Sequence, residues 1–364
     1  MDPSTQLQLQ LAPEIQRFII SNVKRPSEKP LSLGSGSYGT VERLDFNGVI
    51  CAGKSVHESL LDLSNDGIEN IVQKYFEECC ILAELRHPNI VQFFGVCFLP
   101  GVKLPVLVME YLMTNLDTLL EDYANLPLYL KRSILQDVAQ GLVYLHSSKQ
   151  PLIHRDLTAR NVLLTSALTA KIADFGNARF CDISPEKLLK TMTCVPGTPA
   201  YLPPEAFDPH PKYDTTLDSF SFGHLSLFTI VQEFPTPIGY TYIDSVTKSV
   251  VARSEIQRRQ VYVDKMDEVV KDCEVLREMV RSCLSNDPEV RPSAVQLVAY
   301  LQGVKDEIAD PYMGMSKLDM MIALEKSSML ATSGDTSLSK LKVQLHNNSA
   351  ISQQSAPVSL KYCS

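Results

Sequence analysis

The sequence lacks tryptophan altogether and has no apolar run long enough to cross a membrane. Its most apolar long stretch, residues 220–231, is interrupted by serine, glycine and histidine. A membrane-spanning helix needs about 20 mostly apolar residues, so no transmembrane helix is expected. The chain begins with Met1 and Asp2 and shows neither the basic start nor the apolar segment of a secretory signal.

An excess of positive charge is also missing. The chain has 34 Lys and Arg against 42 Asp and Glu, which gives a net charge of -8. Nucleic-acid-binding proteins usually carry a basic face, so no nucleic-acid partner is expected. The nine cysteines are an odd number without paired metal spacing, and adjacent Cys79 and Cys80 fit small buried helix residues. These features predict a reducing compartment and a cytoplasmic location.

The 364 residues are 45% hydrophobic, which is enough to form a sizeable core. Residues 1–27 are a mostly polar flank in which one short helix could form. Residues 31–54 then read as strands around a glycine-rich turn, with Asn47 and Gly48 as a two-residue hairpin. Residues 66–86 have helical apolar spacing, and 90–98 and 105–111 suit strands.

After Leu112 the pattern becomes helical. One apolar stripe repeats at helical spacing through Leu130, Ile134, Val138, Leu142 and Leu145. A loop-rich stretch runs from about 151 to 209, and helical patterns return up to about 304. Beyond 310 the chain is polar, with a helical pattern only at 315–331, which predicts a largely disordered tail.

A glycine-rich string between two predicted strands is the first motif with chemical meaning. It contains Gly34, Ser35, Gly36, Gly39 and Val41. No helix follows it. This favours a flap that covers phosphates and argues against a dinucleotide-binding turn, which would open a helix. Glycine lets backbone N–H groups approach an anion closely. Alone, the string fits a plain glycine-rich hairpin equally well.

A lysine and a glutamate gain meaning together. Lys54 lies one strand beyond the glycine string, where alone it would read as a surface lysine. Glu78 shares an apolar helix face with Tyr75 and Leu82, whereas Glu77 falls off that face. A carboxylate on an apolar face needs a partner. We therefore expect Lys54 and Glu78 to form an ion pair.

The densest signal is the string HRDLTARN at 154–161, followed by DFG at 174–176 and PPE at 203–205. In this order the motifs resemble the eukaryotic protein kinase family, in its tyrosine-kinase-like, serine/threonine-type branch. The resemblance implies an α+β bilobal fold with a nucleotide in the cleft. It implies an N-lobe at 28–111, a five-stranded antiparallel sheet plus one helix. It also implies a mainly helical C-lobe at 112–304, completing a kinase domain at 28–304 before a tail at 305–364.

The resemblance also implies roles. Asp156 would accept the proton of the substrate hydroxyl, and Asn161 and Asp174 would hold Mg²⁺. Lys54, held by Glu78, would orient the phosphates of ATP. The same resemblance places Arg160, in the catalytic loop, among the catalytic residues. The ATP-contacting residues would come from the glycine string, the sheet, the hinge and the C-lobe: Gly34, Ser35, Gly36, Gly39, Val41, Ala52, Lys54, Met109, Glu110, Leu112 and Leu163.

Three supporting contacts are implied as well. Glu205 would pair with Arg291, and Asp218 would bind the backbone of the catalytic loop. An apolar column of Leu82, Phe93, His154 and Phe175 would join the lobes, so that His154 is a packed core residue. Arg155 could pair with a phosphate on the segment 174–205, with Thr193 favoured over Thr191, and Ser184 also present there.

Two signals conflict over the acceptor residue. Thr158, Ala159 and Arg160 resemble the catalytic loop of tyrosine kinases. The loop around Thr198 resembles serine/threonine kinases, in which that hydroxyl binds the catalytic aspartate. We favour serine/threonine transfer to a protein substrate because this loop touches the acceptor. Tyrosine or dual specificity, an ATP-binding pseudokinase scaffold and a tail-driven adaptor remain alternatives, and the sequence does not indicate an oligomeric state.

Overall fold

The structure is a computed structural model. It describes residues 16–27, 30–35, 39–57, 65–102, 104–123, 126–181, 198, 201–207, 214–232 and 260–307. Side chains at 65–72 and 305–307 are not among those described. The expectations for Gly36, for Ser184, Thr191 and Thr193, and for the tail beyond 307 therefore lie outside the described residues. Apart from residues 166–168, the described residues belong to one compact unit.

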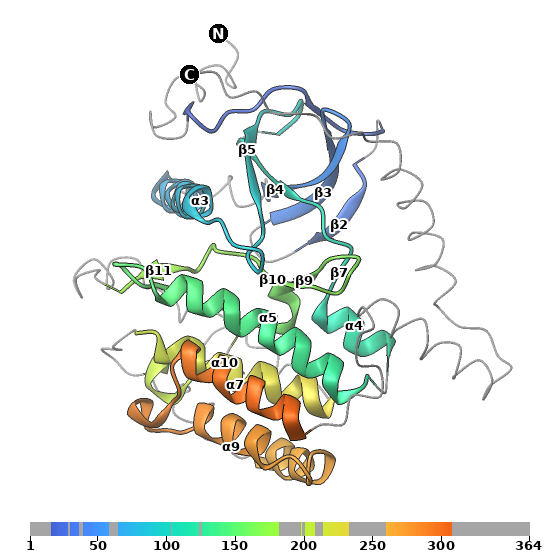
Figure 1. Ribbon diagram of the computed structural model, residues 1–364. Coiled ribbons are helices and arrows are strands. Elements are labelled where there is room, and N and C mark those ends of the chain that lie inside the picture. The colour runs from blue at the N-terminus through green and yellow to red at the C-terminus, as the bar shows by residue number, and fades with distance from the viewer. Residues whose placement is uncertain are drawn as a thin grey trace, which may run out of the picture. The chain divides into compact units, whose positions relative to one another are not determined.

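The N-terminal half forms a curled sheet (Figure 1). All its pairings are antiparallel, in the order β1-β3-β4-β6-β5, with β2 paired to β3. The strands are β1 Val23–Lys24, β2 Ser32–Ser35, β3 Gly39–Phe46, β4 Val49–Val56, β5 Phe93–Cys97 and β6 Val106–Glu110.

The predicted hairpin joins β3 to β4. Asn47 has φ 53° and Gly48 φ 86°, as a two-residue type I′ turn requires. The register runs unbroken from the pair of Phe46 and Val49 next to the turn. Packing leaves no room for a side chain at Gly53, just before Lys54, because a Cβ there would lie 2.3 Å from Leu44 Cδ1.

Helix α3, Asn65–Glu84, confirms the helix expected at 66–86. It contacts β5, and the Tyr75 hydroxyl donates a hydrogen bond to the Pro105 carbonyl. Glu78 and Leu82 are buried on the same face. Cys79 is buried and Cys80 half-buried, and the cysteines in the described part of the chain are all free thiols.

The sheet has one strand more than the five expected, although the fold class is confirmed. The additional strand, β1, lies in the segment that the sequence suggested was a flank with a short helix. Ile19 also forms a parallel bridge with Val96 of β5. The segment has too few apolar residues to show a period of its own, so its pairing depends on edges that only the folded sheet offers.

The C-terminal half is mainly helical. Its helices are α4 Leu116–Asp122, α5 Leu128–His146, α7 Thr216–Val231, α9 Glu274–Cys283 and α10 Ala294–Glu307, and residues 260–269 are also largely helical. The predicted stripe of α5 is buried at every position, and α5 contacts α7 and α10. Helix α7 is buried on nearly all sides, which makes it the central helix of this half. Among the described helices, none combines the length with the low charge and high hydropathy of a membrane-spanning segment.

Short strands hold the loops between the halves. Strands β7 Thr114–Asn115, β9 Val162–Leu164 and β10 Ala170–Ile172 form one small sheet, and β8 Leu152–Ile153 pairs with β11 Arg179–Phe180. Single 3-10 turns lie at η2 Ala159–Asn161, η4 Pro204–Phe207 and η5 Pro288–Val290. These pairings fix both ends of the segment at 154–161 and the start of the segment after Asp174.

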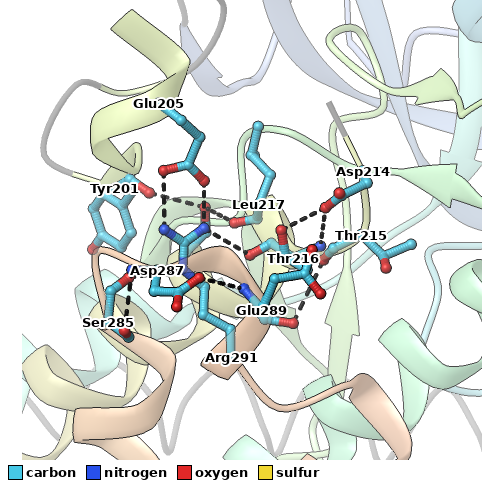
Figure 2. A network of polar contacts seen from close by, with 12 residues as sticks. Tyr201, Glu205, Asp214, Thr215, Thr216, Leu217, Ser285, Asp287, Glu289 and Arg291 are labelled. Atoms are coloured by element: carbon cyan, nitrogen blue, oxygen red, sulfur yellow. Dashed lines mark hydrogen bonds and ion pairs between the residues drawn. The ribbon is translucent and has the colours of Figure 1, made fainter. Parts of the chain in front are cut away.

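An ion pair joins η4 to the residue after η5, as predicted (Figure 2). Both Glu205 oxygens accept hydrogen bonds from the Arg291 guanidinium. Arg291 Nε donates to the Ser285 carbonyl at 2.9 Å, and its guanidinium lies 4.9 Å from the ring centre of Phe220. The Arg291 side chain is fully buried, so its charge depends on these partners.

We predict that Arg291→Ala lowers the free energy of unfolding by about 3 kcal/mol or more, because it leaves Glu205 without its partner. Arg281→Ala is the matched control, since Arg281 pairs with Asp267 at an exposed site, and should cost less than about 1 kcal/mol. Urea unfolding measures both. Equal losses in the two variants would contradict the role of burial.

Candidate active site

Three charged side chains from distant parts of the chain meet at one point. Lys54 Nζ on β4 lies 2.6 Å from Glu78 Oε1 on α3 and 2.8 Å from Asp174 Oδ1, which follows β10. The ion pair of Lys54 and Glu78 expected from the sequence is therefore present. Glu78 is buried, whereas Asp174 keeps part of its side chain exposed.

The three charged groups of this cluster shift one another's pKa values by different amounts. Burial alone would lower the pKa of Lys54, but the two carboxylates outweigh it and raise the pKa. Burial raises the pKa of Glu78, and Lys54 offsets this only in part. Burial would also raise the pKa of Asp174, yet attraction to Lys54 holds it below its usual range. The lysine is therefore the charge on which both acids depend.

The residues around Asp174 are tightly packed. Asp174 has φ 64°, a left-handed backbone that is uncommon outside glycine. The neighbouring Phe175 is fully buried, and its ring lies edge-on to His154 with centres 5.0 Å apart. His154 Nε2 donates to the Ala173 carbonyl at 3.0 Å, so this histidine packs in the core as expected. Leu82 and Phe93, the other proposed column residues, are also buried.

Asp156 is held on both sides of its carboxylate. The backbone N–H and the hydroxyl of Thr198 each donate to Oδ1 at 3.0 Å. Asn177 Nδ2 lies 3.4 Å from Oδ2, and Asn161 Nδ2 donates to the Asp156 carbonyl at 2.8 Å. The contact of Thr198 with Asp156 agrees with the sequence prediction, whereas Asn177 was not singled out from the sequence.

A buried carboxylate holds the backbone just before Asp156. Asp218 Oδ2 accepts from His154 N–H at 2.8 Å, and Oδ1 accepts from Arg155 N–H at 2.9 Å. His146 Nε2 also lies 2.8 Å from Oδ2. Burial would raise the pKa of Asp218, but these partners, His146 first, hold it below the usual range. Asp218 thus binds the loop backbone as expected.

The proposed metal ligands lie at the same end of one hairpin. Asn161 directly precedes β9, Asp174 follows β10, and Ala173 N–H donates to the Asn161 carbonyl at 2.8 Å. No cluster of three or more His, Cys, Asp or Glu with metal-site geometry occurs among the described residues. One carboxylate and one amide oxygen nevertheless fit Mg²⁺, which takes its other ligands from phosphates and water.

Several of the proposed nucleotide contacts share one face of the sheet. Val41 pairs with Lys54 across β3 and β4, and Ala52 pairs with Met109 across β4 and β6. Directly opposed residues and residues two apart on a strand point to the same face. Val41, Ala52, Lys54 and Met109 therefore lie together on that face.

The remaining described contacts proposed for the nucleotide lie on β2, β3, β9 and the segment after β6. Gly34 and Ser35 pair with Val41 and Thr40 at the end of the glycine string, with Gly39 beginning β3. Leu163 lies on β9, and the adjacent Leu164 carbonyl accepts from Met113 N–H at 3.2 Å, next to Leu112.

Glu110 is held at the end of β6. One of its carboxylate oxygens accepts from Gln92 N–H and contacts Lys171 Nζ, both at 2.7 Å. This fixes the segment of Glu110 and Leu112 between the two halves.

In the described part of the chain, the side chain of Arg160 contacts α4 and not Asp156. Its side chain is 77% exposed and donates to Asp117 Oδ2 at 2.8 Å. No side-chain contact of Arg160 with Asp156 is seen among the described residues. Arg160 is therefore positioned at the surface, next to α4.

Comparison with known proteins gives a consistent picture. Residues 28–301 match the protein kinase domain family. The dual specificity protein kinase shkA of Dictyostelium discoideum is 32% identical over 276 residues, which cover 75% of this chain and 48% of that protein. The serine/threonine-protein kinase VIK of Arabidopsis thaliana is 30% identical over 287 residues, or 78% of this chain and 61% of that protein.

A mammalian relative matches over a shorter range. The serine/threonine-protein kinase TNNI3K of Mus musculus is 35% identical over 192 residues, which cover 52% of this chain and 22% of that protein. The chain thus spans 48% and 61% of the length of the first two relatives and 22% of this one.

We predict that Lys54→Met destabilises the protein by about 3 kcal/mol at pH 8 because it leaves two carboxylates facing each other. The loss should shrink towards pH 5. In the variant, buried Glu78 keeps a raised pKa and takes up a proton in the folded state, which adds stability as pH falls. In the natural protein Lys54 offsets part of the rise in the pKa of Glu78, so the same gain is smaller there.

Urea unfolding between pH 8 and pH 5 measures the difference in the free energy of unfolding between the natural protein and Lys54→Met. Lys54→Met combined with Glu78→Gln is the matched control, and it should recover part of the loss and weaken its pH dependence. A gap that stays constant or widens towards pH 5 would contradict the assigned charge coupling.

Proposed function

The chain belongs to the eukaryotic protein kinase family, in its tyrosine-kinase-like branch, and we propose that it transfers the γ-phosphoryl group of ATP to serine or threonine hydroxyls of protein substrates. The observation that supports this most directly is the contact of Lys54 with both Glu78 and Asp174. It joins the sheet face proposed for the nucleotide to the loop proposed for the metal.

Asp156 is the proposed base. Its Oδ1 already accepts two hydrogen bonds from Thr198, and Oδ2 is the oxygen we assign to the acceptor hydroxyl. As that hydroxyl oxygen bonds to the γ-phosphorus, its proton passes to Asp156. The bond between the γ-phosphorus and the bridging oxygen breaks, and ADP leaves with that oxygen. A positioned base of this kind contributes about 10²–10⁴-fold to a rate.

Lys54 and the two metal-ligand candidates would supply the electrostatics. Lys54, held by Glu78, would orient the α- and β-phosphates of ATP on the face that carries Val41 and Ala52. Asn161 and Asp174 would hold Mg²⁺, whose positive charge offsets the charge of the transferring phosphoryl group. The reaction then depends mainly on positions that the fold fixes in advance.

The acceptor class rests on Thr198. Its hydroxyl donates to Asp156 Oδ1, the contact expected from the resemblance of this loop to serine/threonine kinases, which favours serine and threonine. Relatives are named as both serine/threonine and dual specificity kinases, so dual specificity is the second candidate. We further propose a kinase domain at 28–304 and a protein substrate as partner. The cytoplasmic location stays a prediction from the sequence.

We predict that Asp156→Asn lowers kcat at least about 10³-fold, because the amide cannot accept the proton. Binding of magnesium–ATP should change less than about threefold, since Asp156 acts on the acceptor hydroxyl. Radiolabelled phosphate transfer to a peptide library and calorimetric titration with magnesium–ATP measure these effects. A variant that keeps more than a tenth of the natural rate would argue against Asp156 as the base.

We predict phosphoserine and phosphothreonine as the products, identified by phosphoamino-acid analysis. Thr198→Val should lower kcat about tenfold or more, since a hydrogen bond to a charged group is lost. Thr198→Ser keeps the hydroxyl and should retain most of the rate. Phosphotyrosine alone among the products would overturn the acceptor assignment.

A further inference from the structure

Residues 16–25, here called the N-terminal strap, are built into the sheet although the family match begins only at residue 28. Ile20 N–H donates to the Val96 carbonyl and Val96 N–H donates to the Phe18 carbonyl, each at 2.9 Å. A few residues later β1 pairs with β3 at the opposite edge of the sheet. The strap, blue in Figure 1, thus joins β5 to β3 and connects both edges.

The side chains of the strap also enter the fold. Ile20 and Val23 pack against the buried cluster that includes Leu44. Arg25 donates to both carboxylate oxygens of Glu42, at 2.7 and 2.9 Å, and to the Pro100 carbonyl at 3.0 Å. Glu42 is buried, and a buried carboxylate needs such a partner. The strap therefore supplies both core packing and the counter-charge of a buried acid.

One strand position is shaped for the strap. Gly95 on β5 has φ +153°, a backbone conformation that favours glycine. A Cβ at this position would lie 2.6 Å from the Phe18 carbonyl oxygen and 2.7 Å from Ile20 Cγ2. The bulge between Phe93 and Gly95 lies at the same place. Strand β5 thus leaves room for the strap backbone.

The ring of Phe18 reaches a residue that bears on the proposed active site. Its centre lies 6.1 Å from that of Phe93, with the planes at 74°, an edge-to-face geometry that is favourable for aromatic rings. Phe93 is only 3% exposed and pairs with Met109 on β6. Its strand also contacts α3, the helix that carries Glu78.

We propose that Phe18 is a positioning residue for phosphoryl transfer, acting through Phe93. Phe18 packs against Phe93 from the strap that pairs along β5, and Phe93 lies on the strand that contacts α3 and pairs with the Met109 strand. Glu78 then stays within reach of Lys54. This inference rests on the proposed function, and it adds to the active unit a residue that precedes the family match.

The test uses full-length variants. Phe18→Ala removes the ring contact and should lower kcat about threefold to tenfold with little change in KM for ATP, as expected for one lost aromatic pair. Phe18→Leu keeps an apolar side chain and should restore kcat to within about twofold of the natural protein. Ile19→Ala is the matched control, because Ile19 is 44% exposed on the same strap and leaves the backbone pairing intact.

Hydrogen exchange gives a readout that does not depend on turnover. In Phe18→Ala the amides of 93–97 and of 73–84 in α3 should exchange about tenfold faster, whereas those of α5 should not change. Gly95→Ala would displace the strap from the sheet side, because the added Cβ meets the Phe18 carbonyl and Ile20, and it should give the same pattern. Agreement between the two variants identifies the seating of the strap at Phe18 as the cause, since the changes lie on different elements.

Two results would overturn the proposal. One is a Phe18→Ala protein that melts at a lower temperature but keeps the natural kcat, which would make the strap a stabilising element only. The other is unchanged exchange in α3. If the natural protein transfers no phosphate at all, the proposed function fails by itself, and exchange in α3 still decides whether Phe18 positions that helix.

Discussion

The double contact of Lys54 with Glu78 and Asp174 is the constraint on which the rest of the structure depends. A lysine near two carboxylates is stable only if strand β4, helix α3 and the end of β10 are all correctly placed. Each element is fixed by its own contacts: β4 by its pairing with β3 and β6, α3 by the hydrogen bond of Tyr75 to Pro105, and β10 by its pairing with β9. The cluster therefore reports the relative position of three separate parts of the compact unit.

The second centre of organisation is Asp218, which has no exposed surface. It collects two backbone N–H groups and one imidazole, and so holds the loop before Asp156 in a backbone that is otherwise unfavourable. Arg155 there has φ 67°, and Asp174 has φ 64°. Non-glycine residues keep such conformations only where surrounding contacts hold them. Arg155 precedes the proposed base Asp156, and Asp174 is itself a proposed metal ligand, so both conformations occur where the direction of a side chain matters most.

Local patterns predicted those elements whose residues face a large core. The stripe of α5 and the face of α3 follow from apolar spacing, and the turn at Asn47 and Gly48 follows from its backbone needs. The main feature that the sequence did not predict is the pairing of the strap with the sheet. This pairing uses strand edges that lie about 20 to 80 residues away in the chain. Asn177 was overlooked for a related reason, since nothing in its neighbours shows that it faces Asp156.

The sequence alone determined the family resemblance, the order of the motifs and the residue types that could bind a metal or accept a proton. These depend on identity and spacing along the chain, which the sequence contains directly. The tertiary structure decided which of them meet: Lys54 with both acids, Thr198 with Asp156, and Arg160 with Asp117 at the surface. It also decided that residues 16–25 belong to the sheet. Such contacts join residues far apart in the chain, and no local preference of the chain encodes them.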